Sequence, residues 1–239
     1  MSTAQLIAAS LAVVCGALVQ SGVGLGMNLI CVPAFLLIEP GLVPGPALVI
    51  GSLGAAAVAL RCRQGVDFRA TGLATVGRIP GTALGLLAIA VVSARPRVIL
   101  VAAMVLLGCL LSAVGRHVRP RSSTILGAGF LSGAMGVTAA LGGPPLALLY
   151  QRERLEEIRA QLAGFAFLSG CMSLVALLIV GRFGTTDVER SVQLLPALMV
   201  GTALSTLTAS MFANRARMTL VGLSAAAALV VMLEQLSSS

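Results

Sequence analysis

The stretch Gln20–Pro33 reads QSGVGLGMNLICVP and decides the fold that we expect for this chain. It lies within 38 uncharged residues at the start of the sequence, and an apolar stretch of that length is typical of a membrane-embedded segment. Gly22, Gly24 and Gly26 alternate with apolar residues in it, although each glycine costs a helix about 1 kcal/mol relative to alanine. The pattern therefore predicts a broken membrane helix. In transporters such breaks lie at the substrate site, because bare backbone at membrane depth must be buried in protein or line a cavity.

A second stretch of the same kind, SGAMGVTAALGGPP at 132–145, interrupts the uncharged residues 122–151. An offset of 116 residues takes Gly26 in the first stretch to Gly142 in the second. The same offset relates Gly54 to Gly170, Pro80 to Pro196 and Gly85 to Gly201. One offset that serves several separated landmarks predicts an internal duplication, with a first repeat over 1–118 and a second over 119–239.

The composition excludes a soluble protein. Hydrophobic residues make up 58% of the chain, charged residues only 10%, and the mean hydropathy is +1.03, whereas soluble domains carry about 25% charge. We therefore expect an all-α polytopic protein that crosses the cell (inner) membrane several times. The net charge is +8 and all 16 basic residues are arginines. They fall in short loops between apolar segments, which follows the positive-inside rule and does not indicate nucleic-acid binding.

The arginine distribution predicts the topology. Eight apolar segments can be marked, at about 4–38, 42–60, 70–93, 98–115, 122–150, 160–181, 191–213 and 218–234. If each crosses once, the arginines divide 8:7 between the two sides; if the first and fifth return to the side they came from, the division is 11:4, with Arg78 left inside the third segment. The larger bias favours two inverted repeats with both termini outside, each repeat a broken or re-entrant glycine-rich hairpin followed by three transmembrane helices. The count leaves open whether the hairpins are re-entrant or cross twice.

Several chemistries have no signal in the sequence. The five cysteines are scattered without a CxxC pair, and the single histidine, His117, lies in a loop, so we expect no metal site and no cofactor. No Asp, Glu or His lies deep in an apolar segment, which argues against a proton relay or a cation site and favours an anion or a neutral solute. No nucleophile, base and metal set is clustered, so an enzyme is not expected.

Broken helices suit anions because their ends expose unpaired N–H groups and a partial positive charge. The candidate substrate-binding residues are Gln20, Ser21, Gly22, Gly24, Gly26, Asn28, Arg78, Gly136, Thr138, Gly142, Gly143 and Pro144. For each kind of candidate residue, a purely structural interpretation also stays open. The glycines could serve only close helix packing, and the Asn28 amide only a hydrogen bond between helices. Arg78 either attracts or binds the anion or extends its side chain back to the arginine-rich face.

The two glycine stretches together resemble a known family. GVGLGMNLICVP at 22–33 and GVTAALGGPPLA at 136–147 resemble the paired signatures of the TauE/SafE anion permeases. The segment IPGTALGLL at 79–87, after the arginine-rich loop 61–69, is also similar, so that the resemblance covers nearly the whole chain. It implies export or uptake of small anions, with sulfite and organosulfonates as the family's substrates. The family usually has consecutive glycines in its first repeat, whereas Met27 and Asn28 follow Gly26 here.

The expected function is therefore a secondary transporter, a permease or exporter of small anions such as sulfite or organosulfonates, with its site at the broken helices near the bilayer midplane. A passive channel for anions or small solutes is the main alternative, and a structural or assembly subunit is another. The predicted partners are a small-anion substrate and the lipid bilayer, with a homo-oligomer left open and nucleic acid excluded.

Overall fold

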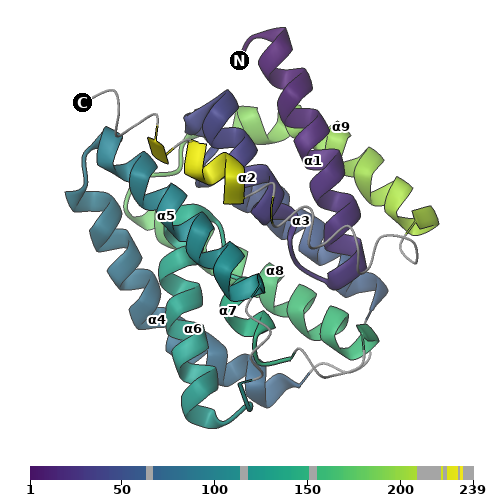
Figure 1. Ribbon diagram of the computed structural model, residues 1–239, viewed down its shortest axis with the longest axis vertical. Helices are drawn as coiled ribbons and strands as arrows, with labels where there is room; N and C mark the ends of the chain where they lie inside the picture. The colour runs from purple at the N-terminus through teal and green to yellow at the C-terminus, as the bar shows by residue number, and fades with distance from the viewer. Residues whose placement is uncertain are drawn as a thin grey trace.

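The computed structural model describes residues 1–62, 67–113, 118–150, 155–208, 222, 225–230 and 232–233, and within these ranges it contains helices and no strand (Figure 1). The all-α prediction is confirmed. In chain order the elements are α1 (Thr3–Val23), α2 (Met27–Ile38), the short 3₁₀ helix η1 (Pro40–Leu42), α3 (Gly45–Arg61), α4 (Phe68–Val91), α5 (Ala94–Ala113), α6 (Ser122–Ala139), α7 (Pro144–Ala147), α8 (Leu155–Ile179) and α9 (Thr185–Thr208).

Some predictions fall on parts of the chain outside the described residues. Arginines used in the topology count are among them, as is the loop histidine: Arg63, Arg116, Arg152, Arg154, Arg215, Arg217 and His117. Of the last apolar segment, 218–234, the structure describes only 222, 225–230 and 232–233.

Three helices are long and apolar enough to cross a membrane, namely the parts Thr3–Gly22, Phe68–Val91 and Arg159–Ile179 of α1, α4 and α8. Shorter apolar helices cover Met27–Ile38, Gly45–Arg61 and Pro96–Ser112. Large apolar side chains lie on the outside of the long helices, for example Leu11 on α1, Leu87 on α4 and Ile179 on α8. An apolar exterior of this kind is what contact with lipid requires, and it marks the chain as a membrane protein.

The first predicted helix break lies between α1 and α2. Gly24, with a φ of 86°, caps the end of α1, and its N–H donates to the carbonyl oxygen of Gln20 at 2.7 Å. Gly26, with a φ of 124°, precedes the first residue of α2. Residues with a side chain rarely adopt such φ values. Glycine at these two positions therefore lets the chain leave one helix and start another within three residues.

The second predicted break lies between α6 and α7. Ala140 ends α6 in the left-handed conformation with a φ of 56°, and residues 141–143 connect it to α7. Pro144 and Pro145 occupy the first turn of α7, where a missing N–H and a fixed φ are tolerated. The helices after the two breaks differ in length, since α2 has 12 residues and α7 has four.

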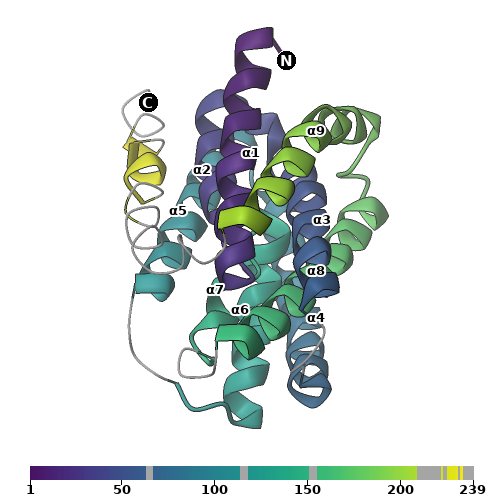
Figure 2. The same cartoon turned by 90° about the vertical axis from the view of Figure 1, so that its right-hand side faces the viewer.

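Three pairs of helices run side by side: α4 with α6, α1 with α9, and α3 with α8 (Figures 1 and 2). Each pair joins a helix from the first half of the sequence to one from the second. Glycines bring α4 and α6 into backbone contact. A Cβ atom at Gly81 would overlap the carbonyl oxygen of Phe130, and one at Gly129 would overlap that of Ala74. Small residues that allow helices to approach this closely are a common feature of membrane helix pairs.

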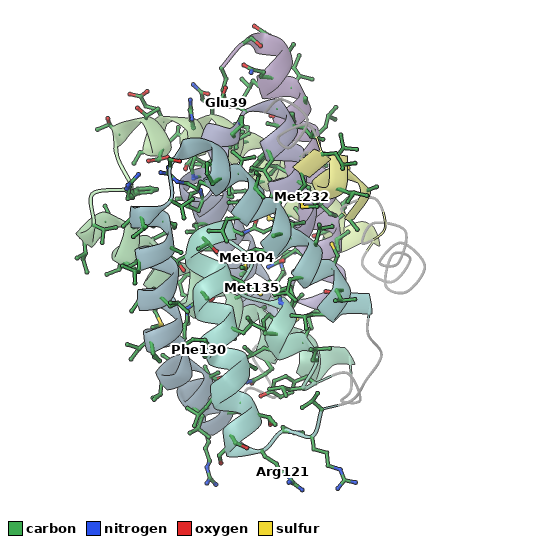
Figure 3. All side chains as sticks on the ribbon, turned by 60° about the vertical axis from the view of Figure 1, so that its left-hand side comes forward. Glu39, Met104, Arg121, Phe130, Met135 and Met232 are labelled. Carbon is green, nitrogen blue, oxygen red and sulfur yellow. The ribbon has the colours of Figure 1, made fainter. Side chains whose placement is uncertain are left out.

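The molecule is elongated, with charged residues at its two ends. Glu39 lies at one end and Arg121 at the other, and Met104 and Met135 lie between them (Figure 3). At the Glu39 end, Nη2 of Arg190 on α9 is 3.6 Å from Oε1 of Glu39, and this is the only ion pair found in the described part of the chain. The central region is apolar and holds the larger hydrophobic cluster, including the fully buried Met135.

Candidate functional site

A pocket of about 50 Å³ lies where the two helix breaks meet. Holding one water molecule takes about 10–15 Å³, so the pocket has room for a small ion. Its walls come from four places: the first break and the start of α2, the second break with α6 and α7, the middle of α3, and the middle of α8. The lining residues are Gln20, Leu25, Gly26, Met27, Asn28, Leu29, Leu48, Gly51, Ser52, Gly136, Ala140, Leu141, Gly142, Gly143, Pro144, Ala166, Ser169 and Gly170.

The pocket brings together seven of the twelve residues proposed from the sequence. They are Gln20, Gly26, Asn28, Gly136, Gly142, Gly143 and Pro144. Ser21, Gly22, Gly24, Arg78 and Thr138 do not line it. Both breaks therefore contribute to one cavity, although 116 residues separate Gly26 from Gly142.

At the first break, the Gln20 side chain holds the start of α2. Its Oε1 accepts a hydrogen bond from the N–H of Met27 at 3.1 Å, across the turn formed by the glycines. Within the described part of the chain, no hydrogen-bond partner is found for the N–H groups of Leu25, Gly26 and Asn28. All three residues line the pocket. The first break thus offers unpaired backbone donors at the N-terminus of a three-turn helix, where the helix dipole also favours negative charge.

Asn28 connects the two breaks. Its Nδ2 donates to the carbonyl oxygens of Ala47, at 3.2 Å, and Ala140, at 2.9 Å. Because both partners are acceptors, the orientation of the amide is determined, and Oδ1 is left buried without a hydrogen-bond partner. The interhelical bond considered from the sequence is therefore present, and Asn28 is also part of the pocket wall.

At the second break, Gly142 and Gly143 line the pocket. The carbonyl oxygen of Gly142 accepts a short hydrogen bond from Oγ of Ser132 on α6. The N–H groups of Gly142 and Gly143 have no backbone partner among the described residues. A Cβ atom at Gly142 would overlap Oγ of Ser169 on α8 and would stand 3.0 Å from Nη1 of Arg78. No residue larger than glycine fits here without displacing the groups behind the pocket wall.

Arg78 is fully buried on α4, and its guanidinium joins three helices. Nη1 donates to the carbonyl oxygen and to Oγ of Ser132, at 2.9 and 2.8 Å. Nη2 donates to the carbonyl oxygen of Ser169 at 2.9 Å and to Oγ of Ser173 at 2.7 Å. The extension to the arginine-rich face considered from the sequence is therefore wrong, whereas attraction of an anion by Arg78 stays a prediction. The side chain does not extend to the arginine-rich face, and it does not line the pocket, because serines on α6 and α8 hold it behind the wall.

The charge of Arg78 has no carboxylate partner. No ion pair involves it in the ranges that the structure describes, and its Nε is buried without a hydrogen-bond partner. A buried cation normally needs such a partner, because leaving water is costly for a charge. The pocket is thus backed by an uncompensated positive charge.

The four other predicted residues have different surroundings. Oγ of Ser21 donates to Oγ of Ser205 on α9, and Oγ1 of Thr138 donates to the carbonyl oxygen of Ala134 within its own helix. The carbonyl oxygen of Gly22 accepts from Arg159, and a Cβ atom at Gly24 would meet the backbone of the same arginine.

Sequence reasoning missed the contribution of α3 and α8. Gly51 and Ser52 on α3 and Ser169 and Gly170 on α8 line the pocket, and none of them was proposed. One signal was present, since the offset of 116 residues that relates the two breaks also takes Gly54 to Gly170. That relation placed small residues in the middle of two apolar segments without indicating that these segments meet.

Long apolar helices, two helix breaks and a pocket between them are together typical of membrane transport proteins. A comparison with protein families identifies the class of transport protein. The model of the sulfite exporter TauE/SafE family matches residues 8–235, and the chain belongs to this family. The resemblance seen in the glycine stretches is thereby confirmed. TauE/SafE is a family of membrane transporters and exporters of sulfur-containing anions rather than of enzymes. No curated protein and no solved structure matches the chain.

Proposed function

We propose that this chain is a secondary transporter that carries a small sulfur oxyanion, such as sulfite or an organosulfonate, through the pocket between its two broken helices. The observation that carries the proposal is the buried, uncompensated charge of Arg78 directly behind a wall of unpaired backbone donors. An anion in the pocket would balance that charge, and a cation would be repelled by it.

The charge acts on the anion through space. Both Nη atoms of Arg78 are committed to serine oxygens, so the anion does not contact the guanidinium. In a membrane interior of low effective dielectric constant, a charge behind the wall still influences the pocket strongly. Arg78 is accordingly a positioning residue that also sets the sign of the accepted charge.

The contacts with the anion come from the backbone. Leu25, Gly26 and Asn28 from the first break and Gly142 and Gly143 from the second line one cavity, and their N–H groups have no backbone partner among the described residues. Backbone donors bind oxyanions well, and they require close approach, which glycine permits. The hydroxyl groups of Ser52 and Ser169 add polar surface. The site therefore recognises charge and size more than a particular side-chain pattern.

The helix pairs support two inverted repeats over 1–118 and 119–239. In the proposed repeats, α1 is equivalent to α6, α3 to α8 and α4 to α9. The pair α1 with α9 then becomes the pair α6 with α4, and the pair α3 with α8 becomes itself. Inverted repeats around a central site are a common basis of alternating access, in which one part of the molecule rocks against the other.

The test is transport by purified protein in liposomes, with radiolabelled sulfite kept under anaerobic conditions so that it is not oxidised. We expect saturable uptake that unlabelled sulfite inhibits and that exchange with internal sulfite accelerates. Gly142→Ala should abolish it, and Gly72→Ala should not, because a Cβ atom at Gly72 meets nothing within 4 Å. Absence of uptake by well-folded protein would overturn the proposal, and uptake that does not saturate would indicate a channel.

A further inference from the structure

A second cavity, of about 240 Å³, lies next to the first helix break, where Ser21 near the end of α1 forms part of its wall. Its polar lining comes from four helices: Ser21 on α1, Arg61 on α3, Arg159 on α8, and Ser205 and Thr206 on α9. Both halves of the chain contribute to it. Apart from Ser21, none of these residues was among the candidates proposed from the sequence, and the family match assigns no role to this cavity.

The two arginines have most of their donors free. Nη2 of Arg159 donates to the carbonyl oxygen of Gly22 at 2.9 Å, and its Nε is buried without a hydrogen-bond partner. Both Nη atoms of Arg61 share one acceptor, the carbonyl oxygen of Thr202, at 3.3 and 3.4 Å. An arginine fork has five N–H donors, so each side chain can bind a further acceptor.

The cavity is electropositive. Two guanidinium groups line it, and no Asp or Glu does so among the residues that the structure describes. Like charges in a partly enclosed space repel, and an oxyanion between them would remove the repulsion and fill the free donors. The hydroxyl groups of Ser21 and Ser205, which bond to each other at 2.7 Å, lie in the same wall.

The cavity is adjacent to the central pocket. Gln20 lines the pocket, and the next residue, Ser21, lines the cavity. Gly22 and Gly24, in the first break, both contact Arg159, which lines the cavity. Neighbouring residues therefore line the two spaces, and the backbone of the break lies in contact with the arginine that would hold the anion.

We propose that this cavity is a second binding site for the transported oxyanion, with Arg61 and Arg159 as its ligands, in series with the central pocket. The site rests on the proposed function, because its ligand is the transported anion. A loading site of this kind would gather the anion on the arginine-rich side of the protein before or after it passes the break.

The experiment counts bound anions. Purified protein in nanodiscs of zwitterionic lipid is dialysed against radiolabelled sulfite under anaerobic conditions. For the wild type we expect one anion in addition to that held by the central pocket. The double variant Arg61→Gln/Arg159→Gln should lose the additional anion, or bind it about tenfold to a hundredfold more weakly, and keep the other. The matched control Arg69→Gln/Arg121→Gln removes the same charge from two exposed positions and should bind as the wild type does.

Two further variants keep the test decisive. Arg159→Lys retains the charge and should bind the additional anion more strongly than the double variant does, although more weakly than the wild type. A purely structural role of Arg159 would not predict this result. Gly142→Ala should remove the central anion and leave the additional one. Equal binding by the wild type and the double variant, both well folded, would overturn the second site while leaving the transporter intact, whereas no sulfite binding at all would overturn the proposed function.

A lipid phosphate group shares the chemistry of a free oxyanion, so a separate experiment is needed to distinguish the two ligands. Native mass spectrometry of wild type and double variant, prepared in anionic lipid, shows whether a phospholipid is retained. A phospholipid held by the wild type and lost from Arg61→Gln/Arg159→Gln would overturn the assignment to the transported anion. No difference in retained lipid, together with the loss of the additional sulfite, would support it.

Discussion

Arg78 and Ser132 are joined by two hydrogen bonds, in which Nη1 of the arginine donates to the serine's carbonyl oxygen at 2.9 Å and to its Oγ at 2.8 Å. The same Oγ donates in turn to the carbonyl oxygen of Gly142. A single hydroxyl group therefore links the buried charge to the backbone of the second helix break, and the position of that backbone depends on it.

Removing the hydroxyl group of Ser132 should weaken anion binding. Ser132→Ala leaves the Gly142 carbonyl and one Nη1 hydrogen without their partner, so we expect a loss of anion affinity by about tenfold and a stability loss of about 1.5–3 kcal/mol. Isothermal titration with sulfite and thermal unfolding measure the two effects. Ser173→Ala is the control, because Ser173 also bonds the guanidinium, whereas Ser132 in addition bonds the backbone of the second break. It should cost stability without the same loss of affinity.

Replacing Arg78 should separate its charge from its shape. Arg78→Gln removes the charge, and we expect sulfite affinity to fall by about 1–3 kcal/mol, the scale of the Coulomb interaction between unit charges several ångströms apart at an effective dielectric constant of about 20. Arg78→Lys keeps the charge but cannot reproduce the fork between α6 and α8, so it should lower thermal stability while retaining more affinity than Arg78→Gln. Equal affinities for the wild type and Arg78→Gln would mean that the anion does not sense this charge.

The left-handed backbone at Gly26 should not tolerate a side chain. Gly26→Ala places a Cβ atom where φ is 124° and where Cγ1 of Val19 would be 3.2 Å away. Strain of this kind costs about 1–3 kcal/mol, so the start of α2 should shift and transport should fall. Gly164→Ala is the matched change, because a Cβ atom there meets nothing within 4 Å. Liposome uptake of sulfite compares the two, and equal uptake would exclude Gly26 from the site.

A negative charge at Asn28 should prevent anion binding. Asn28→Asp has nearly the same shape, but its carboxylate cannot donate to the carbonyl oxygens of Ala47 and Ala140 and would repel an anion in the pocket. We expect sulfite binding to be lost in titrations at neutral pH. Asn28→Ser restores neutrality without the full set of bonds and should bind weakly but measurably. Binding by Asn28→Asp at the wild-type level would show that the anion lies elsewhere.

The two ends of the molecule should face opposite sides of the membrane. Glu39 and Arg121 lie at opposite ends (Figure 3), and the arginine distribution predicts that the Arg121 end is cytoplasmic. In a background without the five native cysteines, Glu39→Cys should react with an impermeant thiol reagent in intact cells, and Arg121→Cys only after the membrane is opened. Labelling of Arg121→Cys in intact cells would reverse the predicted orientation.

The helix breaks could be predicted from sequence because glycine acts locally. The conformations of Gly24 and Gly26 follow from the lack of a side chain, and Pro144 starts a helix through its own ring. The length of the helix after each break could not be predicted in this way. Both stretches remain apolar, and hydropathy alone does not separate the 12-residue α2 from the four-residue α7.

The rest of the site depends on contacts between distant segments. Ser52 and Gly170 meet because α3 packs along α8, and no periodicity in either segment indicates the partner. Arg78 illustrates the same limit. Its burial could be expected from its place in an apolar segment, but its partners Ser132, Ser169 and Ser173 come from two other helices. Only the assembled bundle shows that serines, rather than an anion or the membrane surface, receive its hydrogen bonds.

The glycine contact between α4 and α6 has a consequence for how the protein can be divided. Since the backbones of these helices touch, we expect them to move together, and α4 belongs to the first half of the sequence while α6 belongs to the second. The pair α1 with α9 is mixed in the same way. In the proposed transport cycle, we therefore expect that the units that move against each other are not the two halves of the sequence. A fragment that ends near residue 118 would lack a partner for α1, α3 and α4 alike, and function should return only when both fragments are made together.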